Sequence, residues 1–309
     1  MFKNKEYVLT VYKEGGFTNA AEKLFVSQPS LSASVKRIEE KVTAQIFDRS
    51  TTPVSLTEVG KEYVKYALEI EEKEKDFERY ISDHSNLLTG KIRIGGSSFF
   101  SSFVLPKMIS EFNKKHEKIQ FEVFEDSTKN LLKKLSEGQL DLVIDNAIIS
   151  DDNIVSEVYQ TETLLLSVPK ILNIYNKIEK FKLSAEDVKN DKHLSPSMGV
   201  DLKKFEGQPF ILLNHENDTG KRAAKLFAKH EVTPKVIFHL DQQVTAYNIS
   251  CTGMGISFVS DTLIKNIATS PDLNYYALND RTAIRKVFFY QKKNHYLSYA
   301  CKKFIEYNM

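Results

Sequence analysis

The chain has 309 residues, of which 41% are hydrophobic, so it is long enough for two or three domains with ordinary cores. Its 43 basic and 41 acidic residues leave a net charge of only +2, which excludes a broad positive field as the basis of nucleic-acid binding. No apolar run is long enough for a signal peptide or a membrane span, and Cys251 and Cys301 are too few for a disulfide framework. We therefore expect a cytoplasmic protein with no membrane partner, whose two cysteines are free thiols rather than a redox switch.

Residues 17–60 carry the pattern of two short helices joined by a tight turn, then a hairpin, then the start of a long helix. Thr18 is the expected N-cap of a helix that runs through Phe25. Ser27 is the expected N-cap of the next helix, and Pro29 falls in its first turn, where a missing N–H costs little. In this second helix, the residues that recur at core-facing spacing are Leu31, Val35 and Ile38. The second helix is therefore expected to bury one side and to turn small polar and basic residues outward.

The segment from Phe47 to Thr57 alternates and contains Pro53, which is consistent with a two-stranded wing. Arg49 lies in this wing and is available for a DNA phosphate. Two helices, a tight turn and a wing are the parts that place a helix in the major groove of DNA. A generic helical hairpin with a solvated polar face is the alternative that the pattern alone leaves open.

The same segment resembles the winged helix-turn-helix domain of LysR-type transcriptional regulators. The residues that carry the resemblance are Phe17, Ala20, Ala21, Leu24, Ser27, Gln28, Pro29, Ser32, Ile38, Glu39, Phe47, Arg49, Leu56, Thr57 and Gly60. Two departures stand out: Thr43 replaces the usual glycine, which predicts a less sharp turn, and Ala33 replaces a long polar residue, which removes one expected contact. The resemblance implies a regulator that binds double-stranded operator DNA and a small-molecule effector, with RNA polymerase as a further candidate partner.

The outward face of the second helix supplies most of the expected contacts to DNA. The residues expected to contact DNA or to position the helix are Thr18, Ser27, Gln28, Pro29, Ser30, Ser32, Ser34, Lys36, Arg37, Arg49 and Thr57. Those expected to read base edges are Gln28, Ser30 and Ser34, and those expected to bind the backbone are Lys36, Arg37 and Arg49. Residues 1–60 hold eight basic and seven acidic residues, so each subunit should make few phosphate contacts. Useful affinity therefore requires paired subunits.

Residues 59–89 are expected to form one long linker helix. Its apolar positions follow a period of about 3.5 residues and include Val59, Tyr63, Tyr66, Ile70, Phe77 and Tyr80. At 1.5 Å per residue the helix would be about 45 Å long, too long to be covered by one small domain. Self-pairing into a homodimer is the favoured interpretation, and a single helix lying on its own effector domain is the alternative. The resembled family uses this segment for dimerisation and commonly forms homotetramers.

Residues 90–309 alternate between strand and helix patterns, which predicts parallel sheets covered by helices on both faces. The expected strands are 91–94, 119–124, 140–144, 164–168, 210–213, 236–239, 255–259 and 286–290. The clearest expected helices are 128–136, 219–230, 243–252 and 296–307, and the insertion 171–206 reads as one short helix plus loops. The expected fold is a mainly α winged helix-turn-helix domain (1–58), the linker helix (59–89) and an α/β effector domain of two lobes that resembles periplasmic binding proteins (90–309). Lobe I should comprise approximately 90–162 and 268–309, and lobe II approximately 163–267.

Two such lobes form a hinged cleft in which ligands bind at the carboxyl ends of the strands. The residues expected to line it are Ser97, Ser98, Thr128, Asn214, His215, Thr219 and Gln243. Several of them start helices, whose free N–H groups favour a small anion such as a carboxylate, although each can serve simply as a cap. The family resemblance implicates the loops after the first two strands. Asp126, Asp218 and Asp241 lie near the same loops and leave the charge of the effector open.

No sequence pattern indicates a catalytic residue, a metal site or a cofactor. Gly253-Met254-Gly255 follows a helix and precedes a strand, the reverse of a dinucleotide-binding fingerprint, and the seven histidines lack metal-ligand spacing. We therefore expect a regulator and not an enzyme. The rival hypothesis is a solute-binding receptor or enzyme that uses its N-terminal module only for assembly.

Overall fold

Separate hydrophobic cores divide the chain into an N-terminal unit, residues 1–85, and a C-terminal unit, residues 86–309. The computed structural model describes residues 1–51, 53–84, 90–172, 174 and 178–309. The expected end of the linker helix near residue 89 lies outside these residues. Among the helices that the structure describes, none has the length and apolarity that a bilayer span requires.

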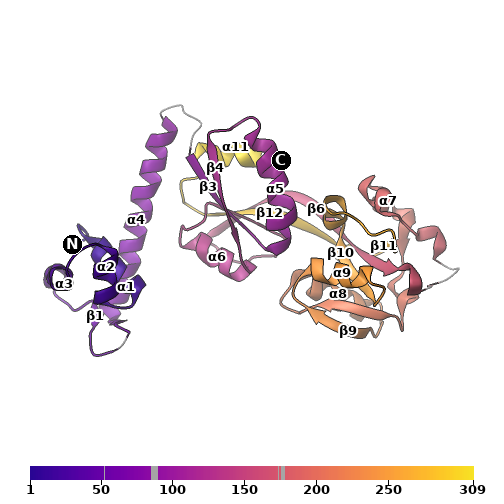
Figure 1. Cartoon of the computed structure of the whole chain (residues 1–309), viewed down its shortest axis with the longest axis horizontal. Coiled ribbons are helices and arrows are strands. Elements are labelled where there is room, and N and C mark those ends of the chain that lie inside the picture. The colour runs from indigo at the N-terminus through magenta and orange to yellow at the C-terminus, as the bar shows by residue number, and fades with distance from the viewer. Residues whose placement is uncertain (52, 85–89, 173, 175–177) are drawn as a thin grey trace. The chain divides into compact units, whose positions relative to one another are not determined.

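The N-terminal unit packs helices around one apolar core, with a short hairpin beside them (Figure 1). Its elements are α1 (Lys5–Glu14), α2 (Phe17–Lys23), α3 (Gln28–Val42), β1 (Phe47–Asp48), β2 (Ser55–Leu56) and α4 (Glu58–His84). Strands β1 and β2 are antiparallel, with Phe47 opposite Leu56. The expected helix pair, wing and long helix are therefore present.

The first helix of the pair starts and ends earlier than its sequence predicts. Gly15 ends α1 with a left-handed backbone (φ 68°), and the chain re-enters a helix at once with Gly16 as N-cap. The prediction that Thr18 is the N-cap was wrong, since Thr18 lies inside the first turn of α2. Helix α2 ends at Lys23, and Phe25 takes a left-handed conformation (φ 55°) that no helix accommodates.

The turn after α3 forms despite the absence of glycine. Thr43 occupies the C-cap with φ 60° and ψ 25°, a left-handed conformation that is costly for a β-branched residue. The prediction of a less sharp turn was therefore wrong. The turn is made, and Thr43 adopts the strained backbone that glycine would adopt freely.

The first lobe of the C-terminal unit has helices on both faces of its sheet (Figure 1). Its elements are β3 (Gly90–Gly96), a turn of π-helix η1 (Phe100–Val104), α5 (Leu105–Asn113), β4 (Ile119–Glu125), α6 (Thr128–Ser136), β5 (Leu142–Asp145), the first part of β6 (Ile154–Pro169), β12 (Ile284–Lys292) and α11 (Tyr299–Asn308). Alternate residues of β3 face opposite ways. Ile92 and Ile94 lie in the core shared with α5 and α11, whereas a Cβ at Gly95 would lie 2.8 Å from Leu131 of α6.

The second lobe is built around parallel strands that are also covered on both sides. Its elements are the end of β6, short 3₁₀ turns η2 (Lys170–Leu172), η3 (Glu179–Phe181), η4 (Lys192–Leu194), η5 (Pro196–Met198) and η6 (Leu202–Phe205), α7 (Ala185–Lys189), β7 (Gly199–Val200), β8 (Pro209–Leu213), α8 (Asp218–Lys229), β9 (Lys235–Leu240), α9 (Gln243–Cys251), β10 (Ile256–Ser260), α10 (Asp261–Asn266) and β11 (Leu273–Leu278), followed by η7 (Arg281–Ala283). The expected single short helix of the insertion is α7.

Two long antiparallel strands, β6 and β12, join the lobes. The sheet order is β4-β3-β5-β12-β6-β10-β8-β9, in which β12 pairs with β5 and with residues 154–163 of β6. The remainder of β6 pairs with β10 and β11 in the second lobe. The sheet is therefore mixed: β3, β4 and β5 are parallel, as are β8, β9 and β10, but the strands that cross between lobes are not.

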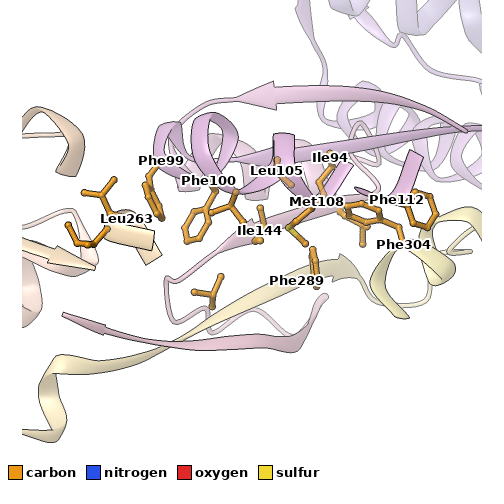
Figure 2. Close-up of a cluster of buried hydrophobic side chains, with 14 of the residues drawn as sticks. Ile94, Phe99, Phe100, Leu105, Met108, Phe112, Ile144, Leu263, Phe289 and Phe304 are labelled. Carbon is orange, nitrogen blue, oxygen red and sulfur yellow. The ribbon is translucent and has the colours of Figure 1, made fainter. Parts of the chain in front are cut away.

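The predicted second border between the lobes, near residue 268, was wrong. Strand β11 was not predicted, and it pairs with β6 and β7 in the second lobe. The chain returns to the first lobe only with β12. Apolar packing also crosses between the lobes, because Phe99 and Phe100 lie in one buried cluster with Leu263 of α10 (Figure 2).

Candidate nucleic-acid interface and effector site

Helix α3 has one buried side and one exposed polar side. The amide of Ser30 donates to the Ser27 hydroxyl at 3.3 Å, and Pro29 lies in the first turn, so the predicted start of the helix is confirmed. The buried residues of this helix are Leu31, Val35, Ile38 and Glu39. On the other side, the exposed residues are Gln28, Pro29, Ser30, Ala33, Lys36 and Arg37, and the half-buried ones are Ser32 and Ser34. Each side chain proposed to contact bases or phosphates from α3 thus lies on the open side or at its margin.

Arg49 is held on the wing by contacts with two helices. Its Nη1 donates to the Ser32 hydroxyl and its Nη2 to Glu39 Oε2, both at 3.2 Å, and its guanidinium lies 4.8 Å from the ring centroid of Phe17. The side chain is still 45% exposed. The Arg49 side chain is therefore held in place before DNA binds, with part of its surface accessible to a phosphate.

Glu39 is the organising residue of this region, and sequence reasoning gave it no role. Its Oε1 accepts from the backbone amides of Ile46 and Phe47, at 2.8 and 3.2 Å, while Oε2 accepts from Arg49. The sequence offered one sign of this role, because Glu39 directly follows the core position Ile38. A carboxylate that is buried needs hydrogen-bond or charged partners.

The hydroxyl of Thr57 is engaged within the protein. It donates to the Gln45 carbonyl at 2.6 Å and accepts from the Gly60 amide at 2.9 Å, as an N-cap of α4. A Cβ at Gly60 would lie 2.0 Å from the Ile46 carbonyl oxygen, so glycine is required for this close approach. Thr57 therefore connects the wing to α4.

Helix α4 exposes apolar side chains along much of its length. The exposed ones are Val59, Tyr66, Leu68, Phe77, Tyr80 and Ile81, and Phe77 is 62% exposed. Ile70 is half-buried, and the rings of Phe77 and Tyr80 stack at 6.5 Å. The assignment of Tyr63 to the dimer seam was wrong, because Tyr63 is 4% exposed, lies in the core of its own unit and stacks on Phe2 at 4.8 Å.

A buried polar network at the crossing strands connects the two lobes. Arg285 of β12 donates to Glu162 of β6 at 2.6 Å, and to Asp218 and Thr219 at the start of α8 at 2.9 and 2.8 Å. Asn146, which follows β5 in the first lobe, donates from its side-chain Nδ2 to the same Glu162 oxygen at 3.1 Å. The register of β6 and β12 places Arg285 opposite Glu162. The network therefore holds residues of both lobes to β6 and β12, the strands that join the lobes.

Thr128 adjoins this network through Asp145, the residue before Asn146. The Thr128 hydroxyl donates to Asp145 at 2.9 Å, and the amides of Asn146 and Ala147 donate to the other carboxylate oxygen. Burial raises the pKa of Asp145, and these hydrogen bonds oppose the rise. Thr128 of the first lobe and Thr219 of the second were both predicted to bind the effector, and both contact this polar region.

Ser97 and Ser98 are half-buried just before η1. The Ser101 amide donates to the Ser97 carbonyl, and its hydroxyl donates to the Gly96 carbonyl at 2.8 Å. A Cβ at Gly96 would lie 3.1 Å from Phe100, so the glycine lets the π-helical turn pack tightly on β3. Such turns occur frequently at functional sites.

The other predicted effector residues do not join this network within the described part of the chain. The Asn214 side chain donates to Asp241 at 2.5 Å, and Gln243 is buried with its carbonyl oxygen accepting from Ser260. His215 is exposed, with its ring centroid 6.5 Å from that of His239.

A surface recess of about 450 Å³ lies elsewhere on the second lobe. Its lining includes Lys170, Lys182 and Lys189, together with Glu186 and Ser270. None of the seven predicted effector residues contributes to it.

Comparison with known proteins agrees with both units. The sequence model of the bacterial regulatory helix-turn-helix protein, lysR family, matches residues 2–61, and that of the LysR substrate binding domain matches residues 85–308. An uncharacterized HTH-type transcriptional regulator, YcgK of Bacillus subtilis, is 25% identical over 98% of this chain and 92% of its own length.

Solved structures show the same fold over the whole chain. A full-length OxyR variant from Pseudomonas aeruginosa superposes with a TM-score of 0.71 at 19% identity, covering 100% of this chain and 94% of its own. Full-length CbnR in complex with its target DNA superposes with a TM-score of 0.60 at 15% identity, covering 100% of both chains. The chain therefore belongs to the LysR family and is a DNA-binding transcriptional regulator with an effector-binding domain, not an enzyme.

Proposed function

We propose that this regulator binds a partly palindromic operator in duplex DNA through the exposed side of α3, with Gln28, Ser30 and Ser34 reading base edges. The observation that carries the proposal is the arrangement of α3. Its apolar side is buried, whereas its small polar side chains are exposed or half-buried. Small polar groups at the start of a recognition helix suit bidentate or close contacts in the major groove. CbnR, which shares this fold, has been solved in complex with its target DNA, which supports DNA binding as the activity of this chain.

Lys36, Arg37 and Arg49 bind the DNA backbone in this proposal, and Thr18, Ser27, Pro29 and Ser32 position the helix. Thr57 acts indirectly, since its hydroxyl holds the wing to α4. With so few cations in each subunit, the affinity of one subunit is modest. We therefore propose a homodimer, and from it a homotetramer, that places two or more recognition helices on one operator.

The exposed apolar side of α4 is the proposed dimer seam. Val59, Tyr66, Ile70, Phe77 and Tyr80 contribute to it, whereas Tyr63 does not. These five residues are separated by seven, four, seven and three positions, so they fall along one side of the helix, and an apolar side of this kind is suited to pairing with a second copy. Operator binding also implies that the protein resides with the DNA in the cytoplasm and works beside RNA polymerase.

The effector is proposed to be a small molecule bound between the lobes. Thr219 accepts a hydrogen bond from Arg285 of β12, Thr128 donates to Asp145 of β5, and Ser97 and Ser98 directly follow β3. Asn214, His215 and Gln243 remain candidates on the second lobe. Arg285 and Arg222 are already paired with carboxylates, so an anionic effector would depend on the N–H groups at helix starts. Binding would shift the population between two arrangements of the lobes, and subunit packing would transmit the shift to the paired α3 helices.

A titration of the full-length protein with the intergenic DNA beside its own gene tests the proposal. Gln28→Ala should weaken specific binding about tenfold, the typical loss for one base-reading side chain. The matched control is Gln139→Ala, an exposed glutamine of the C-terminal unit, which should bind as the wild type does. Equal binding by both variants would remove Gln28 from the interface.

Thermal unfolding in the presence of small carboxylic acids and of their neutral amides tests the charge of the effector. If an acid raises the unfolding temperature and its amide does not, the anionic assignment holds. The opposite result would assign a neutral or cationic effector.

A further inference from the structure

The turn between α2 and α3 carries an exposed aromatic side chain. Phe25 is 96% exposed, more than any other large apolar residue in the described part of the chain. Its backbone is left-handed, with φ 55°. Bulky residues rarely adopt this conformation, because the Cβ of an L-amino acid then lies too close to the following carbonyl oxygen.

The turn holds this ring in a fixed place. The amide of Phe25 donates to the Glu22 carbonyl at 3.1 Å, and that of Val26 donates to the Ala21 carbonyl at 3.0 Å. Leu24 and Val26, on either side, pack against the core of the N-terminal unit. The backbone around Phe25 is therefore anchored on both flanks while its side chain points to solvent.

The position of Phe25 adjoins the surface assigned to DNA. Two residues later Ser27 caps α3, and Gln28, Pro29 and Ser30 follow as exposed residues. The nearest cation along the chain, Lys23, is paired with Glu14 at 2.5 Å. This end of the interface therefore presents an exposed apolar ring close in sequence to a lysine that is already paired.

We infer that Phe25 is a DNA-contacting residue that places its ring against a deoxyribose or a thymine methyl group beside the bases read by Gln28 and Ser30. The inference rests on the proposed function of α3. In the free protein, the backbone of Phe25 adopts an unfavourable conformation and its ring is not buried. Contact with apolar groups of the duplex gives the side chain the burial that its own unit does not, because the thymine methyl and the sugar are the apolar surfaces of a groove.

Asparagine separates binding from folding at this position, since it tolerates a left-handed backbone better than phenylalanine does. Full-length Phe25→Asn should unfold at the same or a higher temperature than the wild type and bind operator DNA roughly fivefold more weakly. Phe25→Tyr, which keeps the ring, should bind within about twofold of the wild type. Phe25→Gly provides a second variant with an unstrained backbone and no side chain.

Operator DNA with uracil in place of thymine distinguishes the two contacts. If wild-type binding weakens on uracil DNA and Phe25→Asn binding does not, the ring contacts a thymine methyl. If uracil has no effect while Phe25→Asn still binds weakly, the ring contacts a sugar.

Wild-type affinity in both Phe25→Asn and Phe25→Gly would overturn the inference, as would a marked loss of thermal stability in both, because the ring would then support the fold. If Gln28→Ala loses binding while the Phe25 variants keep it, the proposed function stands and only this inference fails. If the wild type binds no duplex at all, both fail.

Discussion

The guanidinium of Arg49 lies 3.2 Å from the carboxylate of Glu39, an ion pair that joins the wing to the recognition helix. Because Glu39 also accepts the backbone amides of Ile46 and Phe47, one carboxylate fixes the end of α3 and the start of the hairpin together. The orientation of the proposed recognition helix relative to the wing is therefore set by a charge-assisted contact.

Replacement of Arg49 by alanine should weaken binding to all DNA sequences. A phosphate contact contributes to affinity but carries no sequence information, so specific and non-specific duplexes should lose alike. In mobility-shift titrations, the slope of log K against log salt should become shallower by about 1 for each subunit bound. Arg49→Lys keeps the charge and is the control. An unchanged slope in Arg49→Ala would assign the residue to the Glu39 contact alone.

Replacement of Thr43 by glycine should stabilise the N-terminal unit. Glycine adopts φ 60° without the Cβ clash, so the free energy of unfolding should rise by up to about 1 kcal/mol. Two measurements test the change in the free energy of unfolding: urea unfolding of the full-length protein, and hydrogen exchange of the α3 amides in the native state. Thr43→Ala retains the Cβ and should give no comparable gain. A glycine variant no more stable than the alanine variant would show that the left-handed turn costs little.

Replacement of Arg285 by methionine should strongly destabilise the C-terminal unit. It leaves the buried Glu162 carboxylate without its cation, a loss typically of about 3–5 kcal/mol. Adding Glu162→Leu should recover much of it, because the uncompensated charge is then removed. Lys286→Met, at the exposed neighbouring position, is the control. Additive effects in the double variant would contradict an energetic link between the two residues.

The Asp126 carboxyl should titrate at unusually low pH. Hydrogen bonds from Lys134, Asn130 and the Ser127 amide lower its pKa from 3.8 to about 2. A depressed pKa stabilises the folded state above pH 3.8, and this contribution is lost as the pH falls through about 2. A carbon-13 titration by NMR should place the midpoint near 2, and Lys134→Met should raise it. Lys133→Met removes the neighbouring lysine, which pairs with Glu137, and should leave the midpoint unchanged.

The sequence predicted α3 well because its signals are local. The Ser27 cap, Pro29 in the first turn and the spacing of Leu31 and Val35 all lie within one helix. Tyr63 was misassigned because a repeat of apolar residues does not reveal whether its partner belongs to the same chain or to a second copy.

The hinge network had no local signal. Glu162 and Arg285 are 123 residues apart, and only the register of β6 and β12 brings them together. Strand β11 was missed for a similar reason, since its partner in β6 lies about a hundred residues earlier in the chain. Thr128 and Thr219 were predicted because each starts or nearly starts a helix after a strand. Their connection through buried charges depends on tertiary pairing alone.

Footprinting of the DNA beside the protein's own gene tests the central claim most directly. The full-length wild-type protein should protect a partly palindromic site at low salt, and Gln28→Ala should need about tenfold more protein for the same protection while remaining folded by circular dichroism. Absence of any protected site, across a range of salt concentrations and with candidate effectors added, would contradict the assignment of α3 as the helix that reads DNA.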